Sequence, residues 1–198
     1  MLEIRPATAD RWADLVALFG AGGASSGCWC MWFRVAPKIW SANGNAGNRA
    51  ALESHVAQGR QPGLLACAGG QPVGWVSVAP RPDFERIAGP GAREDGVWSV
   101  VCFFIRPGQR GRGVGRALLG AAIEHARRGG ARVLEAYPAE RAGTSNADAF
   151  TGPRSLFERA GFREAGRFDR WRAAPLAGTA DEKPLSRPPG RPVMRLEL

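Results

Sequence analysis

The sequence predicts an α/β fold in which one mixed sheet of about seven strands carries helices on both faces. An almost wholly apolar run, Val97–Ile105, has the character of a central strand that is covered on both faces. An amphipathic helix and another strand follow this run, as in a crossover between two parallel strands. Before the run, two short apolar segments flank residues 69–72, Gly-Gly-Gln-Pro, which have the composition of a hairpin turn.

The first part of the chain is predicted to hold a strand, two helices and a hairpin. Leu2–Arg5 alternates like a strand, and Thr8 is a candidate N-cap for a helix that ends at Phe19. Glycines between residues 20 and 27 interrupt that helix. The remaining elements expected here are a helix over Asn43–Gln58 and strands over Leu64–Ala68 and Val73–Ala79.

After a polar connection over residues 80–96, the second part alternates strands with helices. The elements expected after Val97–Ile105 are a helix over Val114–Arg128, a strand over Arg132–Tyr137, a short helix over Arg154–Ala160, and strands over Phe162–Phe168 and Val193–Leu198. A Pro- and Gly-rich stretch over about 173–192 precedes the last strand and is expected to be a mobile loop. We expect one domain over residues 1–198, because that strand would otherwise have no sheet to join.

Composition narrows the functional classes. The chain has 198 residues, of which 44% are hydrophobic, and a formal charge of +9, mostly from arginine. Such a charge indicates anionic partners such as nucleotides, phosphates or nucleic acid, although an arginine-rich codon usage explains it equally well. The four cysteines form no C-x-x-C pair, so no metal site is expected. No signal peptide or membrane-spanning run is recognisable, which predicts a soluble, cytoplasmic protein without a membrane partner.

The most informative segment runs from Ile105 to Arg116. A buried strand ends, a loop with glycines at 108, 111, 113 and 115 turns, and an amphipathic helix begins. Glycines allow backbone N–H groups to approach an anion closely, and the start of the helix carries partial positive charge. Arg110, Arg112 and Arg116 add cationic side chains at the same point. This combination suits a pyrophosphate, whereas neither the dinucleotide fingerprint nor a Walker loop is present.

The segment Arg110-x-x-Gly113-x-Gly115 resembles the phosphate loop of the GCN5-related N-acetyltransferases. Two later segments are similar to the same family: residues 155–162, Ser-Leu-Phe-Glu-Arg-Ala-Gly-Phe, and residues 192–196, Pro-Val-Met-Arg-Leu. The predicted element order also agrees. The resemblance therefore covers essentially the whole chain and implies the fold of that family, with a pantetheine cleft between two central parallel strands.

The resemblance implies that acetyl-CoA is the co-substrate and that a primary amine attacks its thioester directly. Phe103, Phe104 and Ile105 would contact the pantetheine arm along the strand. The pyrophosphate would lie on the backbone N–H groups of the loop and the first helical turn, which comprise Arg110, Gly111, Arg112, Gly113, Val114, Gly115 and Arg116.

The catalytic groups depart from the family pattern. Phe157 stands where a tyrosine commonly protonates the leaving thiolate, and Thr151 falls near a common asparagine. The only tyrosine, Tyr137, ends the strand that should flank the thioester, so it is the candidate general acid; its alternative is a packing role. Glu135 projects to the same side as Tyr137. It is the candidate base or holder of a cationic substrate, or it forms an ion pair with a nearby arginine, for example on the following helix.

The acceptor side is expected to involve the aromatic segment after the first helix. Trp29 and Trp32 are candidates for an apolar wall, or else they form a local core that anchors two helices. Three functions remain open: acetylation of a small amine, acetylation of a macromolecule such as a protein N-terminus, a lysine or an aminoacyl-tRNA, and a CoA-binding module without catalysis. Nucleic acid is therefore a conceivable partner, though not the favoured one, and a homodimer is compatible with the family.

Overall fold

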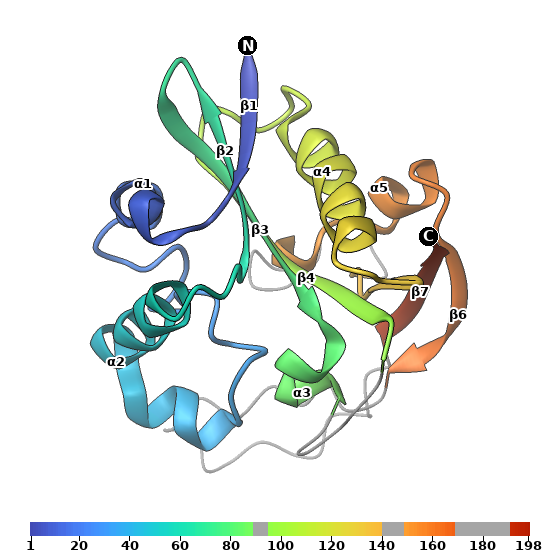
Figure 1. Ribbon diagram of the computed structural model, residues 1–198, viewed down its shortest axis with the longest axis horizontal. Coiled ribbons are helices and arrows are strands. Elements are labelled where there is room, and N and C mark those ends of the chain that lie inside the picture. The colour runs from blue at the N-terminus through green and yellow to red at the C-terminus, as the bar shows by residue number, and fades with distance from the viewer. Residues whose placement is uncertain (89–94, 140–148, 169–190) are drawn as a thin grey trace, which may run out of the picture.

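The computed structural model describes residues 1–88, 95–139, 149–168 and 191–198, and Figure 1 shows its arrangement. Seven strands form one mixed sheet in the order β1-β2-β3-β4-β5-β7-β6. The strands are β1 (Leu2–Pro6), β2 (Gly63–Ala68), β3 (Gln71–Pro80), β4 (Val97–Ile105), β5 (Val133–Ala136), β6 (Arg163–Phe168) and β7 (Arg191–Glu197). The helices are α1 (Trp12–Phe19), α2 (Pro37–Ala57), α3 (Glu85–Ala88), α4 (Val114–Arg128) and α5 (Arg154–Arg159), with 3-10 turns η1 (Ala9–Arg11), η2 (Arg81–Asp83) and η3 (Ala149–Thr151).

The predicted fold class is confirmed: the sheet is mixed and open, and helices cover both of its faces. In Figure 1, α1 and α2 lie on one side of the sheet, and α4 and α5 on the other. β4 and β5 are parallel and are joined through α4, whereas the other neighbouring strands are antiparallel. The last strand inserts between β5 and β6.

Two apolar clusters hold these layers together. On one face, Leu118, Leu119 and Ala122 of α4 are almost fully buried against the sheet. On the other, Leu15 of α1 and Leu52 of α2 pack with the segment that joins those two helices. Because strand side chains alternate between faces, the strands contribute to both clusters, and the central strands are buried from both sides.

The larger differences from the sequence prediction concern three segments. The second helix begins at Pro37, whose fixed φ suits a first helical turn, and it bends at Gly44, where φ is +56°. The polar connection after β3 contains the short turns η2 and α3. Most of the predicted loop over 173–192 lies outside the described residues, but Arg191 and Pro192 belong to β7.

Candidate active site

Residues 106–113, called the glycine–arginine loop below, connect β4 to α4 as predicted. Gly108, Gly111 and Gly113 have φ values of +83°, +75° and +80°, in the left-handed region that favours glycine. A Cβ atom at any of the three would meet no heavy atom within 4 Å, so the loop faces open space. Gly113 is the N-cap of the 15-residue helix α4. Unpaired N–H groups and the positive end of the helix dipole therefore point into a solvent-accessible region.

The cationic side chains of this loop are exposed, as an anion site requires. Arg110, Arg112 and Arg116 all lie at the surface. Arg110 donates from Nε to the carbonyl oxygen of Ile105 at 3.4 Å, which ties this side chain to the end of β4. The loop thus combines backbone donors, a helix start and guanidinium groups in one place, which is a suitable environment for two linked phosphates.

The two central parallel strands separate beside this loop. Their pairing runs from Val97 with Val133 to Val100 with Ala136, and there it ends. β4 continues for five more residues to Ile105. Val101 is skipped in the register between β3 and β4, because Ser77 pairs with Cys102 and Val78 with Val100. Such a bulge leaves its extra residue outside the ladder, so the backbone of Val101 is available where β5 leaves the sheet.

A row of polar side chains crosses the sheet one residue before that separation. Ser99, Glu135 and Arg195 are direct neighbours on β4, β5 and β7. Glu135 is only 1% exposed, and Ser99 is fully buried. Burial of a carboxylate is costly unless it is paired and hydrogen-bonded, so the partners of Glu135 determine what it can do.

Both oxygens of the Glu135 carboxylate have partners. Oε1 accepts hydrogen bonds from the Arg195 guanidinium, with Nε at 2.7 Å and a terminal nitrogen at 2.6 Å. Oε2 accepts the Tyr137 hydroxyl at 2.6 Å and lies 3.4 Å from Nε of Arg81. The ion pair weighed from the sequence is therefore present, but the arginines come from β7 and η2 rather than from the following helix, α5.

Tyr137 follows the last residue of β5 and is 1% exposed. Burial raises the pKa of its hydroxyl well above the usual value, and the charge of Glu135 and the hydrogen bond to it act in the same direction. The hydroxyl of Ser99, 3.2 Å away, has the opposite and smaller effect on this pKa. Tyr137 is therefore protonated at neutral pH and donates its proton toward Glu135.

Phe157, at the position where the family pattern has tyrosine, is part of the core. It is fully buried, with ring centroids 6.1 Å from Phe103 and 5.4 Å from Phe162. Its ring thereby supports Phe103 on β4, one of the residues expected to border the pantetheine arm. Thr151 is also buried and accepts a hydrogen bond from Arg191 at 2.8 Å.

The two tryptophans that are candidates for the acceptor wall differ in burial. Trp29 is 2% exposed and lies against Trp12 in a tilted contact and Phe19 in an edge-on contact. Its ring nitrogen donates to the side-chain oxygen of Asn45 at 2.5 Å. It therefore occupies the local core that the sequence left as one of two interpretations. Trp32 is partly exposed, and the Arg86 guanidinium lies 3.8 Å from its ring centroid.

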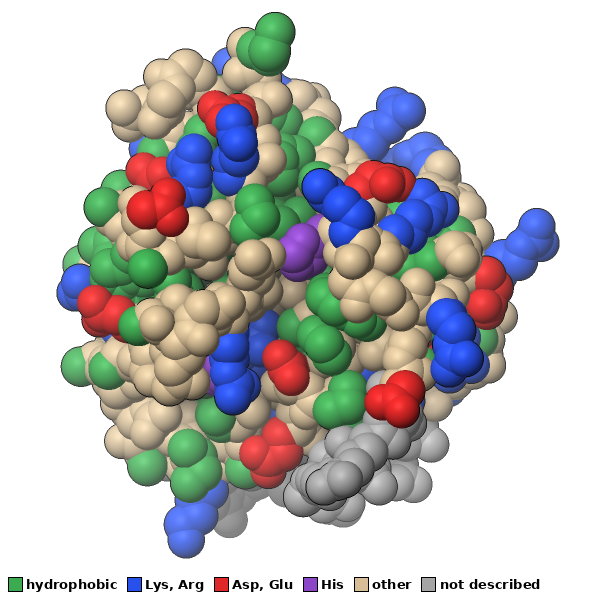
Figure 2. All heavy atoms as spheres, in the orientation of Figure 1, with side chains coloured by type: hydrophobic (Ala, Val, Ile, Leu, Met, Phe, Trp, Pro, Cys, Tyr) green, Lys and Arg blue, Asp and Glu red, His purple; other side chains and the backbone are tan. Residues whose placement is uncertain are grey.

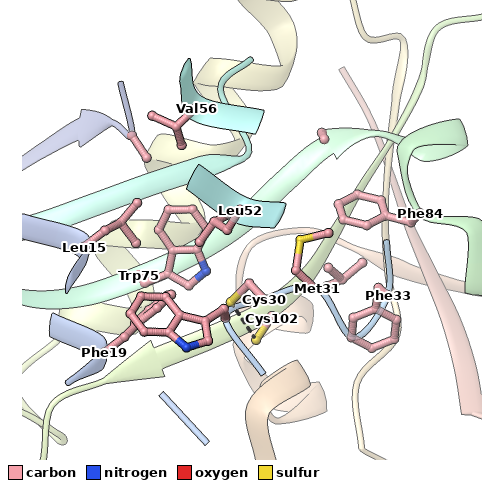
Figure 3. Close-up of a cluster of buried hydrophobic side chains, with 14 of the residues drawn as sticks. Leu15, Phe19, Cys30, Met31, Phe33, Leu52, Val56, Trp75, Phe84 and Cys102 are labelled. Atoms are coloured by element: carbon pink, nitrogen blue, oxygen red, sulfur yellow. Dashed lines mark hydrogen bonds between the residues drawn. The ribbon is translucent and has the colours of Figure 1, made fainter. Parts of the chain in front are cut away.

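All four cysteines are free thiols, and three of them are buried. Cys30 and Cys102 are free thiols with their sulfur atoms 3.7 Å apart in the cluster that Figure 3 shows. Burial is the main cause that raises the pKa of Cys30, so the unreactive thiol form dominates. No group of three or more His, Cys, Asp or Glu side chains within the described ranges could hold a metal ion.

The sequence did not identify Ser99, Arg81 and Arg195 as site residues. A serine in an apolar strand was the one local signal, because a fully buried hydroxyl needs a partner. No local sequence signal marks the two arginines, since their contacts with Glu135 depend on strand order and register.

None of the helices in the described ranges is long and apolar enough to cross a membrane.

Comparison with known proteins agrees with this geometry. Residues 29–162 match the model of the acetyltransferase (GNAT) family. Over 105 residues the chain is 33% identical to an uncharacterised N-acetyltransferase of Methanocaldococcus jannaschii, a match that covers 52% of this chain and 40% of that protein. The chain thus spans less than half the length of that relative.

Solved structures with the same fold cover nearly the whole chain. One is a protein from Desulfovibrio desulfuricans assigned to the GNAT family, with 17% identity, a TM-score of 0.59, and coverage of 100% of this chain and 99% of that one. A second is PaiA N-acetyltransferase from Thermoplasma acidophilum, in complex with coenzyme A. It has 12% identity, a TM-score of 0.54, and coverage of 100% of this chain and 99% of that one. A third is ribosomal-protein-alanine N-acetyltransferase from Brucella melitensis, with 23% identity, a TM-score of 0.55, and coverage of 99% of each chain.

At identities below 25%, the likeness to these structures establishes the fold alone. Membership of the family rests on the match to the family model. The ends of the β4–β5 pairing and the glycine–arginine loop lie within the matched residues. The chain therefore belongs to the acetyltransferase (GNAT) family, a family of acyltransferases.

Proposed function

We propose that this chain binds acetyl-CoA and transfers the acetyl group to a primary amine of a small molecule. The separation of β4 and β5 after Val100 and Ala136, next to an exposed glycine–arginine loop, is the observation that carries the proposal. The coenzyme A complex of the related PaiA fold supports the choice of donor. Direct transfer requires both substrates in one site, which lowers the entropic barrier to reaction.

In this proposal the donor is held by two parts of the chain. The pyrophosphate lies on the N–H groups from Arg110 to Arg116, with the guanidinium groups around it. The pantetheine arm runs along Phe103, Phe104 and Ile105, where β4 has no β5 partner. The thioester then lies near Val101, whose backbone N–H we assign to the carbonyl oxygen as charge develops on it.

The nitrogen of the neutral amine forms a bond to the thioester carbonyl carbon, and the carbon–sulfur bond breaks. Glu135 accepts the proton that the amine loses, directly or through the Tyr137 hydroxyl to which it is bonded. Tyr137 is the candidate acid for the departing sulfur. Because a thiol has a pKa of about 8.5, its thiolate also leaves without full protonation, so the tyrosine is expected to assist the step rather than to be indispensable.

Trp32 remains the candidate contact for the acceptor, because it is partly exposed and packs against the cluster that contains Tyr137. Trp29 supports the same segment from within the core. The test is amine-dependent release of the CoA thiol across a panel of primary amines. If acetyl-CoA binds but no amine or peptide gives turnover, the chain is a binding module and the catalytic proposal fails.

Acetylation of a macromolecule is a second candidate, favoured by the charge of +9. RNA binding separates it from the first, since release of counterions makes such binding fall steeply as salt rises. Tight RNA binding with that salt dependence would favour an aminoacyl-tRNA acceptor over a small amine.

A further inference from the structure

A second cavity lies at the end of the sheet remote from the glycine–arginine loop. It has a volume of about 910 Å³ and is bordered by β1, the segment between α2 and β2, the end of β3, Trp98 at the start of β4, and the C-terminal turn of α4. The whole of α4, about 22 Å at 1.5 Å per residue, separates this end from the phosphate loop. In Figure 2, hydrophobic side chains lie among Lys and Arg side chains near the middle of the face, between the positions of α2 and α4 in Figure 1.

A buried arginine contributes to the wall of this cavity. The side chain of Arg34 is only 2% exposed. One terminal nitrogen donates to the carbonyl oxygen of Pro62 at 2.9 Å, and the other lies 3.7 Å from the carboxylate of Asp83, which is itself partly exposed. The guanidinium also lies 4.6 Å from the ring centroid of Phe84.

The charge of Arg34 is incompletely balanced. Nε of Arg34 has no hydrogen-bond partner among the described residues, although it is buried. Burial lowers the pKa of this side chain to about 10, and Asp83 only partly opposes that effect. A buried cation with one long ion pair is unfavourable by itself and is stabilised when an anion completes its hydrogen bonds.

The cavity as a whole is cationic. Arg5, Arg34, Arg60 and Arg128 line it, against the carboxylates of Glu3 and Asp83, an excess of two positive charges. Arg60 and Arg128 form no ion pair with a carboxylate in the part of the chain that the structure describes, whereas Arg5 pairs with Glu3 at 2.6 Å. The C-terminal ends of α2 and α4 also lie here, and each carries roughly half a negative charge. A ligand with one negative charge therefore fits better than a doubly charged phosphate.

The rest of the wall is apolar. Ile4, Pro6, Pro62, Pro80 and the Trp98 ring border the same space, and Trp98 is held by an edge-on contact with His125 at 5.6 Å. A pocket of this volume with apolar walls and a few convergent charges is typical of small-molecule sites.

We propose that this cavity binds a small organic monocarboxylate with an apolar or aromatic body. Its carboxylate pairs with Arg34 and the rim arginines, and its body lies against Trp98 and the prolines. Ser99, Glu135 and Tyr137 do not line the cavity, so it is separate from the proposed catalytic centre. The two are adjacent in sequence, however, since Pro80 precedes Arg81, Trp98 precedes Ser99, and η2 carries both Arg81 and Asp83. Occupancy is thus positioned to affect the arginine that contacts Glu135.

The test is a calorimetric titration of the full chain with naphthoate and with its neutral analogue naphthamide, in the presence of saturating CoA. The CoA keeps the phosphate loop occupied, so naphthoate cannot bind there. We expect naphthoate to bind and naphthamide to bind at least about tenfold more weakly, because charge-assisted hydrogen bonds are lost. Equal affinities, or no naphthoate binding at all, would overturn the proposal.

Variants locate the binding. Arg34→Gln should abolish naphthoate binding, and Arg128→Gln should weaken it by about threefold to tenfold. The control is Arg127→Gln, which changes the neighbouring arginine on α4 that pairs with Glu124 and does not line the cavity. Should Arg34→Gln fail to fold, the surface double variant Arg60→Gln with Arg128→Gln takes its place. An equal loss in the Arg127 variant would refute the assignment, because binding would then follow net charge alone.

Discussion

At the scale of single residues, the chemistry that we propose depends on how Glu135 is held. The carboxylate is buried, yet two guanidinium groups and one phenol surround it. Arg195 is about half exposed and Arg81 one-fifth exposed, so solvent weakens both ion pairs relative to a fully buried pair. These partners offset the desolvation cost of the buried Glu135 carboxylate. Glu135 also remains hydrogen-bonded to Tyr137, which directly follows β5 at the point where its pairing with β4 ends.

Glu135→Gln keeps the shape of this side chain and removes its charge. We expect turnover to fall most at low pH, because there the acceptor arrives as an ammonium ion and must lose a proton before it attacks. At high pH the amine arrives neutral, and hydroxide can take the proton that it loses on attack. We also expect a loss of about 1–3 kcal/mol in the free energy of unfolding, since Arg195 and Arg81 lose an anionic partner. Rates measured across pH beside the wild type test this. A constant ratio would assign Glu135 a structural role.

Tyr137→Phe removes the hydroxyl that joins Glu135 to Ser99. We expect CoA affinity to be unchanged and turnover to fall by about tenfold to a hundredfold, at or below the lower end of the usual range for acid–base groups. Steady-state rates with CoA affinity measured in parallel provide the check. Wild-type turnover would exclude Tyr137 as the acid.

The single tyrosine also gives a direct spectroscopic prediction. Its raised pKa means that the folded chain resists ionisation above pH 10, where a free tyrosine ionises. The unfolded chain releases that proton first, so the contribution of Tyr137 to stability is intact below about pH 10 and declines as the pH rises above it. Ultraviolet absorbance of tyrosinate should therefore appear together with unfolding in the native protein, but near the ordinary pKa in denaturant. A native protein that gains the tyrosinate signal near pH 10 while still folded would show that Tyr137 is accessible.

At the scale of elements, β4, its loop and α4 act as one unit. Gly74 on β3 allows α4 to pack closely against the sheet, because a Cβ atom at this position would lie 2.8 Å from the Val114 side chain and 3.1 Å from the Leu118 side chain. The start of α4 therefore sits directly on the sheet, and the position of the loop follows from that contact.

Gly74→Ala should displace the start of α4. We expect it to lower the free energy of unfolding by about 1–3 kcal/mol and to weaken CoA binding. Gly120→Ala is the matched control, because Gly120 lies within α4 and its Cβ would meet nothing within 4 Å. This second change should stabilise the protein by roughly 0.5–1 kcal/mol through helix propensity. Denaturant unfolding of both variants provides the check, and equal effects would mean that the contact with α4 is unimportant.

Gly113→Glu tests the loop itself. Any side chain at Gly113 is strained by its φ of +80°, at a cost of about 1–2 kcal/mol, so Gly113→Ala is the appropriate control. Only the glutamate adds a negative charge beside the pyrophosphate. We expect CoA to bind the Glu variant about a hundredfold more weakly than the Ala variant, measured by calorimetry. Equal affinities would place the pyrophosphate elsewhere.

The same comparison of elements explains what the sequence could predict. Val97–Ile105 and the following glycines are local signals, and the structure has a central strand and loop in those positions. The bond between Arg195 and Glu135 joins residues 60 positions apart and depends on β7 inserting between β5 and β6. No local pattern encodes that insertion or its register. The start of α2 at Pro37 was missed because Gly44 interrupts the helical pattern.

At the scale of the whole molecule, the two binding sites that we propose lie at opposite ends of the sheet. The β4–α4 end presents backbone donors and exposed arginines, whereas the remote end holds a cavity around a buried arginine. The polar row of Ser99, Glu135 and Arg195 crosses the sheet between them. The charge of +9 is thus distributed over distinct sites as well as over the general surface.

The central claim is that acetyl-CoA binds at the separation of β4 and β5 through the glycine–arginine loop. Calorimetric titration of the wild-type chain with acetyl-CoA, repeated at higher salt, tests it most directly. We predict a dissociation constant on the order of micromolar that rises moderately with salt, as expected for phosphates bound by arginines together with an uncharged arm. No detectable binding at either salt concentration would contradict the claim and would mean that the loop serves another anion or only the fold.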